Sequence, residues 1–399
     1  MRKITLLFTV LTLVFSSCND ELQGVDPQIA KLVTTQLATL PSERAAEIMN
    51  TITNTPEERR EGMAFLFAYM PQHDLDTLSI EVIEKNVEYA YKARTNFEWC
   101  ASLPLEVFYN DVLPYVTMDE TRENWREPFY AMLEPVVKES KDAFAAIDTI
   151  NKALRDLVNV DYNTKRKRAN QSPFESMEIN MASCSGLSIL LTDALRAAGL
   201  PARIAGAPMW ITKEGNHNWS EVWVDGKWYI IEYYPAELNN TWFLDRCAAF
   251  EGQDDPQHQV YATSYMPTSQ KISFPMVWNK RDTSVNGEKV TDRYVARYKE
   301  LEQQKELQEN GTAIEIRAAK KGGDVKISGD RIAIEVKIID SKSGEEIAKG
   351  KTSGPNADMN DYLVLYVPKN GEYKISYDSD STKTLKVGDE DKLEVVLNK

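Results

Sequence analysis

The stretch MASCSGLSILLTDALRAAGLPARIAG, residues 181–206, places a cysteine where a helix should begin. Ser183-Cys184-Ser185-Gly186 is small and polar, apolar residues then recur at helical spacing from Leu187 to Ala198, and Gly199-Leu200-Pro201 ends the run. A thiol at a helix start lies near the positive end of the backbone dipole and near unpaired N–H groups, which lower its pKa. The pattern alone leaves two interpretations of Cys184, a nucleophile or a small residue in a tight corner.

A hairpin further along the chain is predicted to bring a base and an acid to one face of a sheet. His217–Val224 and Lys227–Tyr233 have the composition of strands, and Asp225-Gly226 between them is a strong signal for a two-residue turn. In that register His217 shares a face with Glu232, one diagonal step away, with β-carbons roughly 5–8 Å apart. A three-residue turn would instead place Glu232 on the opposite face.

Nucleophilic catalysis by a thiol needs a base, and the base needs a partner that holds its tautomer. Cys184, His217 and Glu232 are the candidates for these three roles. Glu237 is the alternative acid if the second strand ends differently. The oxyanion of an acyl intermediate would accept the N–H of Cys184 and one further donor. The candidates for that second donor are Gln171 and Trp210.

The same residues stand in motifs that resemble the transglutaminase-like superfamily, whose core is papain-like. The similarity covers roughly residues 140–290, and its motifs follow one another in the family's order. One segment is similar to the family's Gly-Ile-Pro-Ala-Arg, and another to its His-x-Trp-x-Glu-Val. The matching segments, in chain order, are Ala182–Gly186, Ala198–Arg203, His217–Val222 and Gly226–Trp228.

The resemblance implies an enzyme, with one departure from the family pattern. Glu232 stands where the family usually has Asp, which keeps the charge and adds one methylene. A triad of Cys184, His217 and Glu232 would attack amide bonds of peptides or proteins and form a thioester acyl-enzyme, with hydrolysis favoured over amine transfer. The alternative is a non-catalytic envelope lipoprotein that uses the papain-like cleft and a β-sandwich for recognition. No cofactor or metal site is predicted, because the three histidines are scattered along the chain.

The first residues have the composition of a targeting segment. Arg2 and Lys3 precede an apolar run from Ile4 to Phe15, and two serines come directly before Cys18. Such a run is too short for a permanent membrane span and is typical of a signal peptide, here residues 1–17. Small residues before a cysteine resemble the bacterial lipobox, which would make Cys18 the lipidated residue. The predicted location is the bacterial cell envelope, lipid-anchored in the outer membrane and facing the periplasm or the surface.

Charge and cysteine content narrow the choice of partners. The formal net charge of −14 argues against nucleic acid and against a polybasic membrane patch. The predicted partners are therefore a peptide or protein substrate, and a membrane through the lipid on Cys18. A disulfide between Cys100 and Cys247 stays open, and so does the oligomeric state.

The chain is predicted to be α+β, with a helical N-terminal region, a papain-like core in which a helix packs on an antiparallel sheet, and a C-terminal all-β sandwich. The sandwich resembles transthyretin-like or carboxypeptidase-regulatory domains, and residues 163–181 are expected to form a loop. The predicted segments are a signal peptide at 1–17, a helical domain at 24–140, the core at 141–290, a connecting helix at 291–309 and the sandwich at 310–399.

Overall fold

The structure is a computed structural model that describes residues 22–278, 282–355, 361–377 and 381–399. The predicted α+β class, with a papain-like helix-and-sheet core and a β-rich C-terminal region, is confirmed. The chain divides into two compact units, one ending at Val295 and the other beginning at Ala296. The predicted signal peptide and Cys18 lie outside the described residues.

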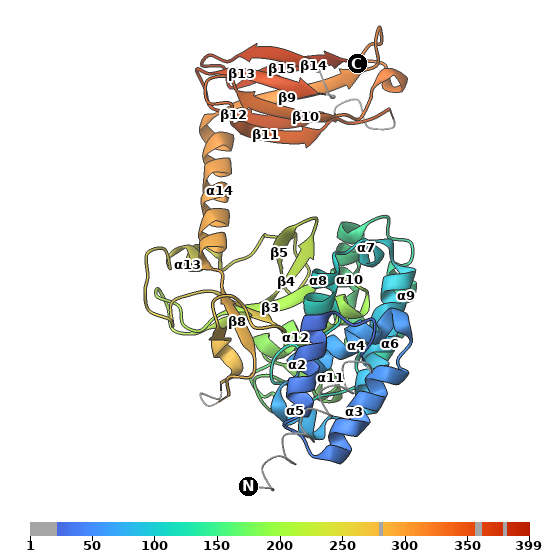
Figure 1. The fold of residues 1–399 in the computed structure, drawn as a ribbon. Coiled ribbons are helices and arrows are strands. Elements are labelled where there is room, and N and C mark those ends of the chain that lie inside the picture. The colour runs from blue at the N-terminus through green and yellow to red at the C-terminus, as the bar shows by residue number, and fades with distance from the viewer. Residues whose placement is uncertain (1–21, 279–281, 356–360, 378–380) are drawn as a thin grey trace, which may run out of the picture. The chain divides into compact units, whose positions relative to one another are not determined.

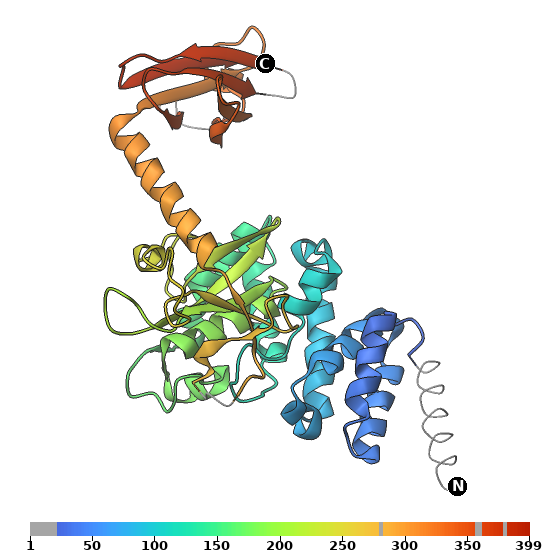
Figure 2. The ribbon, with the colours of Figure 1, turned by 60° about the vertical axis from the view of Figure 1, so that its left-hand side comes forward.

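Short helices build the first part of the first unit (Figure 1). A proline stands at the N-cap of three of them, Pro41, Pro56 and Pro71, where its fixed φ starts a helix and cannot continue the preceding one. Figure 2 shows that the bluest helices lie at the end of the unit away from the sheet. The helices are α2 (Pro27–Leu37), α3 (Ser42–Asn54), α4 (Glu57–Tyr69), α5 (Gln72–Thr77) and α6 (Ile80–Asn96).

A second group of helices connects that layer to the sheet. Helix α6 packs on α9, and α9 packs on α10 and α12, so one apolar core runs through the unit. The elements are α7 (Glu98–Ala101), α8 (Leu105–Val107), the π-helix η1 (Phe108–Val112), α9 (Arg126–Val137), α10 (Ala143–Val158), α11 (Pro173–Ile179) and α12 (Cys184–Ala197).

The predicted loop at 163–181 is wrong in part, because it contains helix α11. Ser172 caps this helix by accepting from the N–H of Glu175, and the Glu175 side chain accepts from the N–H of Ser172 in return. Pro173 occupies the first helical position. The polar composition of the segment predicted a loop, but capping interactions stabilise a short helix within it.

An antiparallel sheet of six strands lies beside α12, in the order β5-β4-β3-β6-β8-β7. The predicted turn is confirmed: Asp225 and Gly226 have φ of 49° and 84°, and Val224 pairs with Lys227. The strands are β3 (Ala202–Ala207), β4 (His217–Val224), β5 (Lys227–Ile231), β6 (Tyr261–Ser264), β7 (Ile272–Ser273) and β8 (Asn286–Lys289). Outside this sheet are a parallel pair, β1 (Asp161–Tyr162) and β2 (Met181–Ala182), and the short helices α13 (Leu244–Ala248) and η2 (Pro275–Val277).

Helix α12 is the central element of the core and is buried along almost its whole length. Ser183 caps its start by accepting from the N–H of Gly186, which fixes the position at which Cys184 enters the helix. Gly199 ends it with a φ of 73°, and a β-carbon there would lie 2.7 Å from the side chain of Cys100. The helix packs on β3 and β4. The side chain of its first residue, Cys184, is hydrogen-bonded to His217, the first residue of β4.

The second unit is built from β-strands after helix α14 (Thr291–Asn310). One sheet has the order β11-β10-β13-β14 and the other the order β12-β9-β15, and a single apolar cluster includes residues of both. The likeness to transthyretin-like domains and the predicted domain boundaries stay predictions. The elements are β9 (Thr312–Ala319), η3 (Ser328–Asp330), β10 (Glu335–Asp340), β11 (Glu346–Lys351), β12 (Leu363–Val367), β13 (Glu372–Tyr377), β14 (Ser381–Lys386) and β15 (Lys392–Asn398).

Within the described residues, none of the helices combines the length and the apolar character needed to cross a bilayer.

Candidate active site

Cys184 is the first residue of α12, and its thiol meets several groups that favour the thiolate. Burial alone would raise the pKa of the thiol. The hydrogen bond to His217, the charge of His217 and the backbone N–H groups of Asn218 and Ser185 outweigh burial and lower the pKa. These contacts distinguish Cys184 from Cys100 and Cys247, whose pKa values burial raises.

His217 begins β4 and contacts both other candidate residues. Its Nε2 lies 2.8 Å from Oε1 of Glu232, which leaves Nδ1 for the thiol of Cys184. Burial alone would lower the pKa of the imidazole. The hydrogen bonds to Cys184 and Glu232, together with their charges, outweigh burial and raise the pKa to about 9. The lowered pKa of the thiol and the raised pKa of the imidazole both favour a thiolate beside an imidazolium.

Glu232 is the residue directly after β5, and three contacts fix it. Besides His217, its carboxylate accepts from the hydroxyl of Thr241 at 3.0 Å. Its backbone carbonyl accepts from the side-chain amide of Asn151 in α10 at 2.8 Å. Glu237, the alternative acid, is exposed, and the structure brings Glu232 to the imidazole instead.

The three residues open onto a cavity of about 350 Å³. Aromatic side chains surround its mouth: Trp242 and Tyr162 are 54% and 51% exposed, and Tyr234 is also exposed. The ring of Trp242 lies 5.0 Å from the imidazole, between their centroids. The sequence predictions missed these aromatics because they come from irregular segments or strand ends, where no periodicity assigns a side chain to a face.

Neither candidate for the second oxyanion donor is among the residues that line this cavity. The side chain of Gln171 is buried and donates to the carbonyls of Glu175 and Met181. Trp210 is buried and stacks on Phe250 with ring centroids 5.9 Å apart. Both side chains are instead engaged by neighbouring residues in the core.

A buried polar network lies behind the imidazole. The indole of Trp219 stands between His217 and Tyr294 and donates to the hydroxyl of Tyr294 at 2.6 Å. That hydroxyl donates to Glu221, which is 1% exposed and also accepts from Arg203 at 2.9 Å and from Arg293. Since Arg293 and Tyr294 belong to the first turn of α14, this turn helps to hold the wall of the site.

The other cysteines and histidines do not join the site. Cys100 and Cys247 are both free and buried, so the disulfide that the sequence left open is not formed. His73 is exposed on α5, and His258 contacts the carbonyl of Met209. In the residues that the structure describes, no group of three or more His, Cys, Asp or Glu side chains is arranged to hold a metal ion.

Comparisons with protein families and with solved structures gave matches to part of the chain. Residues 130–233 match the transglutaminase-like superfamily, so the chain carries a domain of that class around the cysteine and histidine. A search of curated proteins found no match. Among solved structures the chain is similar to "a Putative Cysteine Protease from Cytophaga hutchinsonii", with 16% identity and a TM-score of 0.27. That similarity covers 33% of this chain and 43% of the other.

Proposed function

We propose that the protein is a cell-envelope cysteine enzyme of transglutaminase-like type that attacks amide bonds of peptides or proteins. Cys184 is the nucleophile, His217 the base and Glu232 the residue that orients the base. The observation that carries the proposal is the imidazole of His217, which is hydrogen-bonded to Glu232 on one side and to Cys184 on the other, beside an open cavity. This is the arrangement that activation of a thiol requires.

The reaction follows from these contacts. The thiolate attacks the amide carbonyl carbon, and the oxyanion that forms accepts a hydrogen bond from the backbone N–H of Cys184. The imidazolium of His217 then gives its proton to the leaving nitrogen, the C–N bond breaks, and a thioester remains on Cys184. Water attacks the thioester while His217 takes its proton, and the thiolate leaves as the carboxylic acid forms. Glu232 holds the ring in place through its contact with Nε2.

Hydrolysis is the favoured outcome over transfer to an amine. The cavity is open at its mouth, where the aromatic side chains are half exposed, so water reaches the thioester. Among the residues that line the cavity, Glu232 is the acidic side chain and it is already engaged by His217 and Thr241. No acidic group is therefore left there to hold a cationic amine acceptor.

Alkylation by iodoacetamide as a function of pH tests the thiol chemistry. Burial raises the pKa of Cys100 to about 12 and raises that of Cys247 well above its usual value, so neither thiol should react. Cys18 is the remaining competitor, and the experiment therefore uses the Cys18→Ala variant as its background. Cys184 should then react alone, at a pH below the ordinary thiol pKa, and His217→Ala should move the reaction to higher pH. A rate that follows an ordinary thiol pKa and does not change in His217→Ala would contradict the proposal.

A measurement of catalytic turnover distinguishes the proposed enzyme from a non-catalytic recognition protein. The purified chain is incubated with a denatured protein mixture, and new α-amino groups are counted by mass spectrometry. We expect their release by the parent and not by Cys184→Ser. A reactive thiol with no release of amines would favour the non-catalytic recognition protein.

The lipid anchor is a separate part of the proposal and rests on the sequence of residues 1–18 alone. We expect the parent to fractionate with membranes and Cys18→Ala to be released in soluble form. Membrane retention of Cys18→Ala would contradict lipidation at this residue. It would leave the proposal for Cys184 unaffected.

A further inference from the structure

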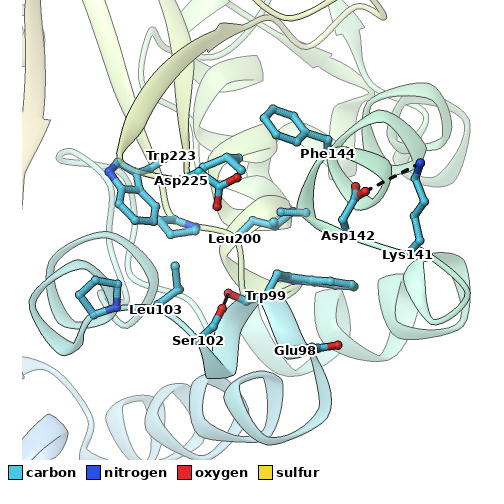
Figure 3. A pocket seen from close by; sticks show the side chains of 14 residues that line it. Glu98, Trp99, Ser102, Leu103, Lys141, Asp142, Phe144, Leu200, Trp223 and Asp225 are labelled. Atoms are coloured by element: carbon cyan, nitrogen blue, oxygen red, sulfur yellow. Dashed lines mark hydrogen bonds and ion pairs between the residues drawn. The ribbon is translucent and has the colours of Figure 1, made fainter. Parts of the chain in front are cut away.

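A second cavity, of about 400 Å³, is lined by residues that directly follow the C-terminal end of α12, whereas the thiol lies at its N-terminal end. Figure 3 shows the side chains that line this cavity. Its walls come from the α7 segment, the start of α10, Leu200 and Pro201 after α12, and the tip of the β4–β5 hairpin. Helix α12 has 14 residues, so at about 1.5 Å per residue the cavity lies roughly 20 Å from Cys184. It is therefore separate from the candidate active site.

The aromatic walls of this cavity are held in place by neighbouring residues. Trp99 stacks on Phe97 with centroids 4.9 Å apart and planes inclined by 7°, and its indole N–H donates to the carbonyl of Ala198 at 2.9 Å. Phe144 is 39% exposed and packs edge-on against Tyr229. Trp223 and the other labelled side chains surround the hollow in Figure 3. Because these contacts hold the rings of Trp99 and Phe144, a ligand that stacks on them would bind without the entropic cost of ordering those rings.

The polar residues of the cavity carry an excess of negative charge. Glu98, Asp142 and Asp225 line it, and Lys141 is the one cation among the lining residues, all of which the structure describes. The ammonium of Lys141 lies 3.9 Å from Asp142, and the lysine side chain is 84% exposed. Two carboxylates, those of Glu98 and Asp225, are left for a cation from outside. Fixed aromatic faces beside free carboxylates are the features that recognise a cationic group.

We propose that this cavity binds the cationic side chain of a peptide segment that carries arginine. The planar guanidinium stacks on an aromatic face and donates to a carboxylate at the same time, which suits the combination of Trp99 and Trp223 with Glu98 and Asp225. Charge complementarity selects arginine peptides over acidic ones, because a carboxylate would meet repulsion from the same residues. The site is independent of the thiol chemistry.

Calorimetric titration of the purified full chain with the blocked pentapeptide Gly-Arg-Gly-Arg-Gly tests the proposal. The informative variant is Glu98→Gln with Asp225→Asn. Asparagine tolerates the φ of 49° at position 225, so the hairpin turn is retained. The matched control is Glu81→Gln with Glu84→Gln, which removes the same charge from exposed positions on α6. We expect the first variant to bind about three- to tenfold more weakly, as the loss of two exposed charge contacts predicts, and the control to change less than twofold.

Three outcomes would overturn the proposal. One is no binding of the arginine peptide to the parent at millimolar concentration. Another is an equal loss of affinity in both double variants, which would show attraction by net charge alone. The third is tighter binding of N-acetylglucosamine than of the peptide, which would make the cavity a sugar site. Cys184→Ser should bind the peptide as the parent does, so this test is distinct from the test of the enzyme.

Discussion

Substitution of Glu232 by glutamine should move the shared proton from the imidazole back to the thiol. The carboxylate lies 2.8 Å from Nε2 of His217 and stabilises the imidazolium whether or not Cys184 is ionised. The charge of the Glu232 carboxylate therefore favours the thiolate–imidazolium pair over the neutral thiol–imidazole pair. Glutamine keeps the size of the side chain and the possibility of a hydrogen bond, but it removes the charge.

The expected size of the effect follows from the burial of the pair. The side chains of His217 and Glu232 are 15% and 20% exposed, so solvent screens their interaction only in part. A hydrogen bond to a charged group in such a place contributes about 1.5–3 kcal/mol. Since 1.36 kcal/mol corresponds to a factor of ten, the ratio of ion pair to neutral pair should fall by roughly ten- to a hundredfold.

The assay is the rate of iodoacetamide alkylation against pH, in the Cys18→Ala background. The rate near pH 7 should drop in Glu232→Gln, and the main rise in rate should move toward the ordinary pKa of a thiol. Glu237→Gln is the matched control, since it makes the same change at an exposed position five residues on. Equal profiles for the parent and Glu232→Gln, or an equal effect of Glu237→Gln, would refute the role given to Glu232.

The remaining predictions concern geometry and support. Glu232→Asp keeps the charge but withdraws the carboxylate by about 1.5 Å, so its effect on the same profile should be smaller than that of glutamine. Gly206→Ala should lower the free energy of unfolding by about 1–3 kcal/mol, since a β-carbon would lie 2.0 Å from Oδ1 of the buried Asn218. Tyr294→Phe should lower the free energy of unfolding by about 1–3 kcal/mol, because the indole N–H of Trp219 would be left buried without an acceptor.

Urea unfolding followed by tryptophan fluorescence measures both stability changes, because all eight tryptophans precede residue 295 and report on the first unit alone. Tyr229→Phe, which removes a hydroxyl group from a half-buried residue of the first unit, is the control for Tyr294→Phe. A control that destabilises the unit as much as its test variant would remove the stated reason for the effect.

The parts of the site that depend on local sequence were predictable. The turn at Asp225-Gly226 takes left-handed φ values that aspartate and glycine tolerate, and this fixed the pairing of β4 with β5. The predicted strand from His217 to Val224 has the bounds of β4. Once the register is set, the period of two along a strand decides the face of His217.

The parts that depend on distant packing were not predictable. Trp242 reaches the imidazole from a segment without regular structure, and Tyr294 reaches Trp219 from 75 residues further along the chain. Gln171 is polar and near the cysteine in sequence, but its amide is used up by two backbone carbonyls. A pattern of residue types does not show which donors tertiary packing has already engaged.

The glutamate at position 232 has a physical reason in the way β5 ends. Ser220 pairs with Ile231, the last residue of the strand, so Glu232 follows opposite Trp219, and its side chain must cross a diagonal to reach His217. The path of the backbone beyond that point is set by Asn151 of α10, whose side chain holds the carbonyl of Glu232 and the N–H of Ala236. With the backbone anchored there, the extra methylene of glutamate supplies the reach to the 2.8 Å contact. The departure from the family's aspartate therefore still brings a carboxylate to the imidazole, because the helix and the longer side chain act together.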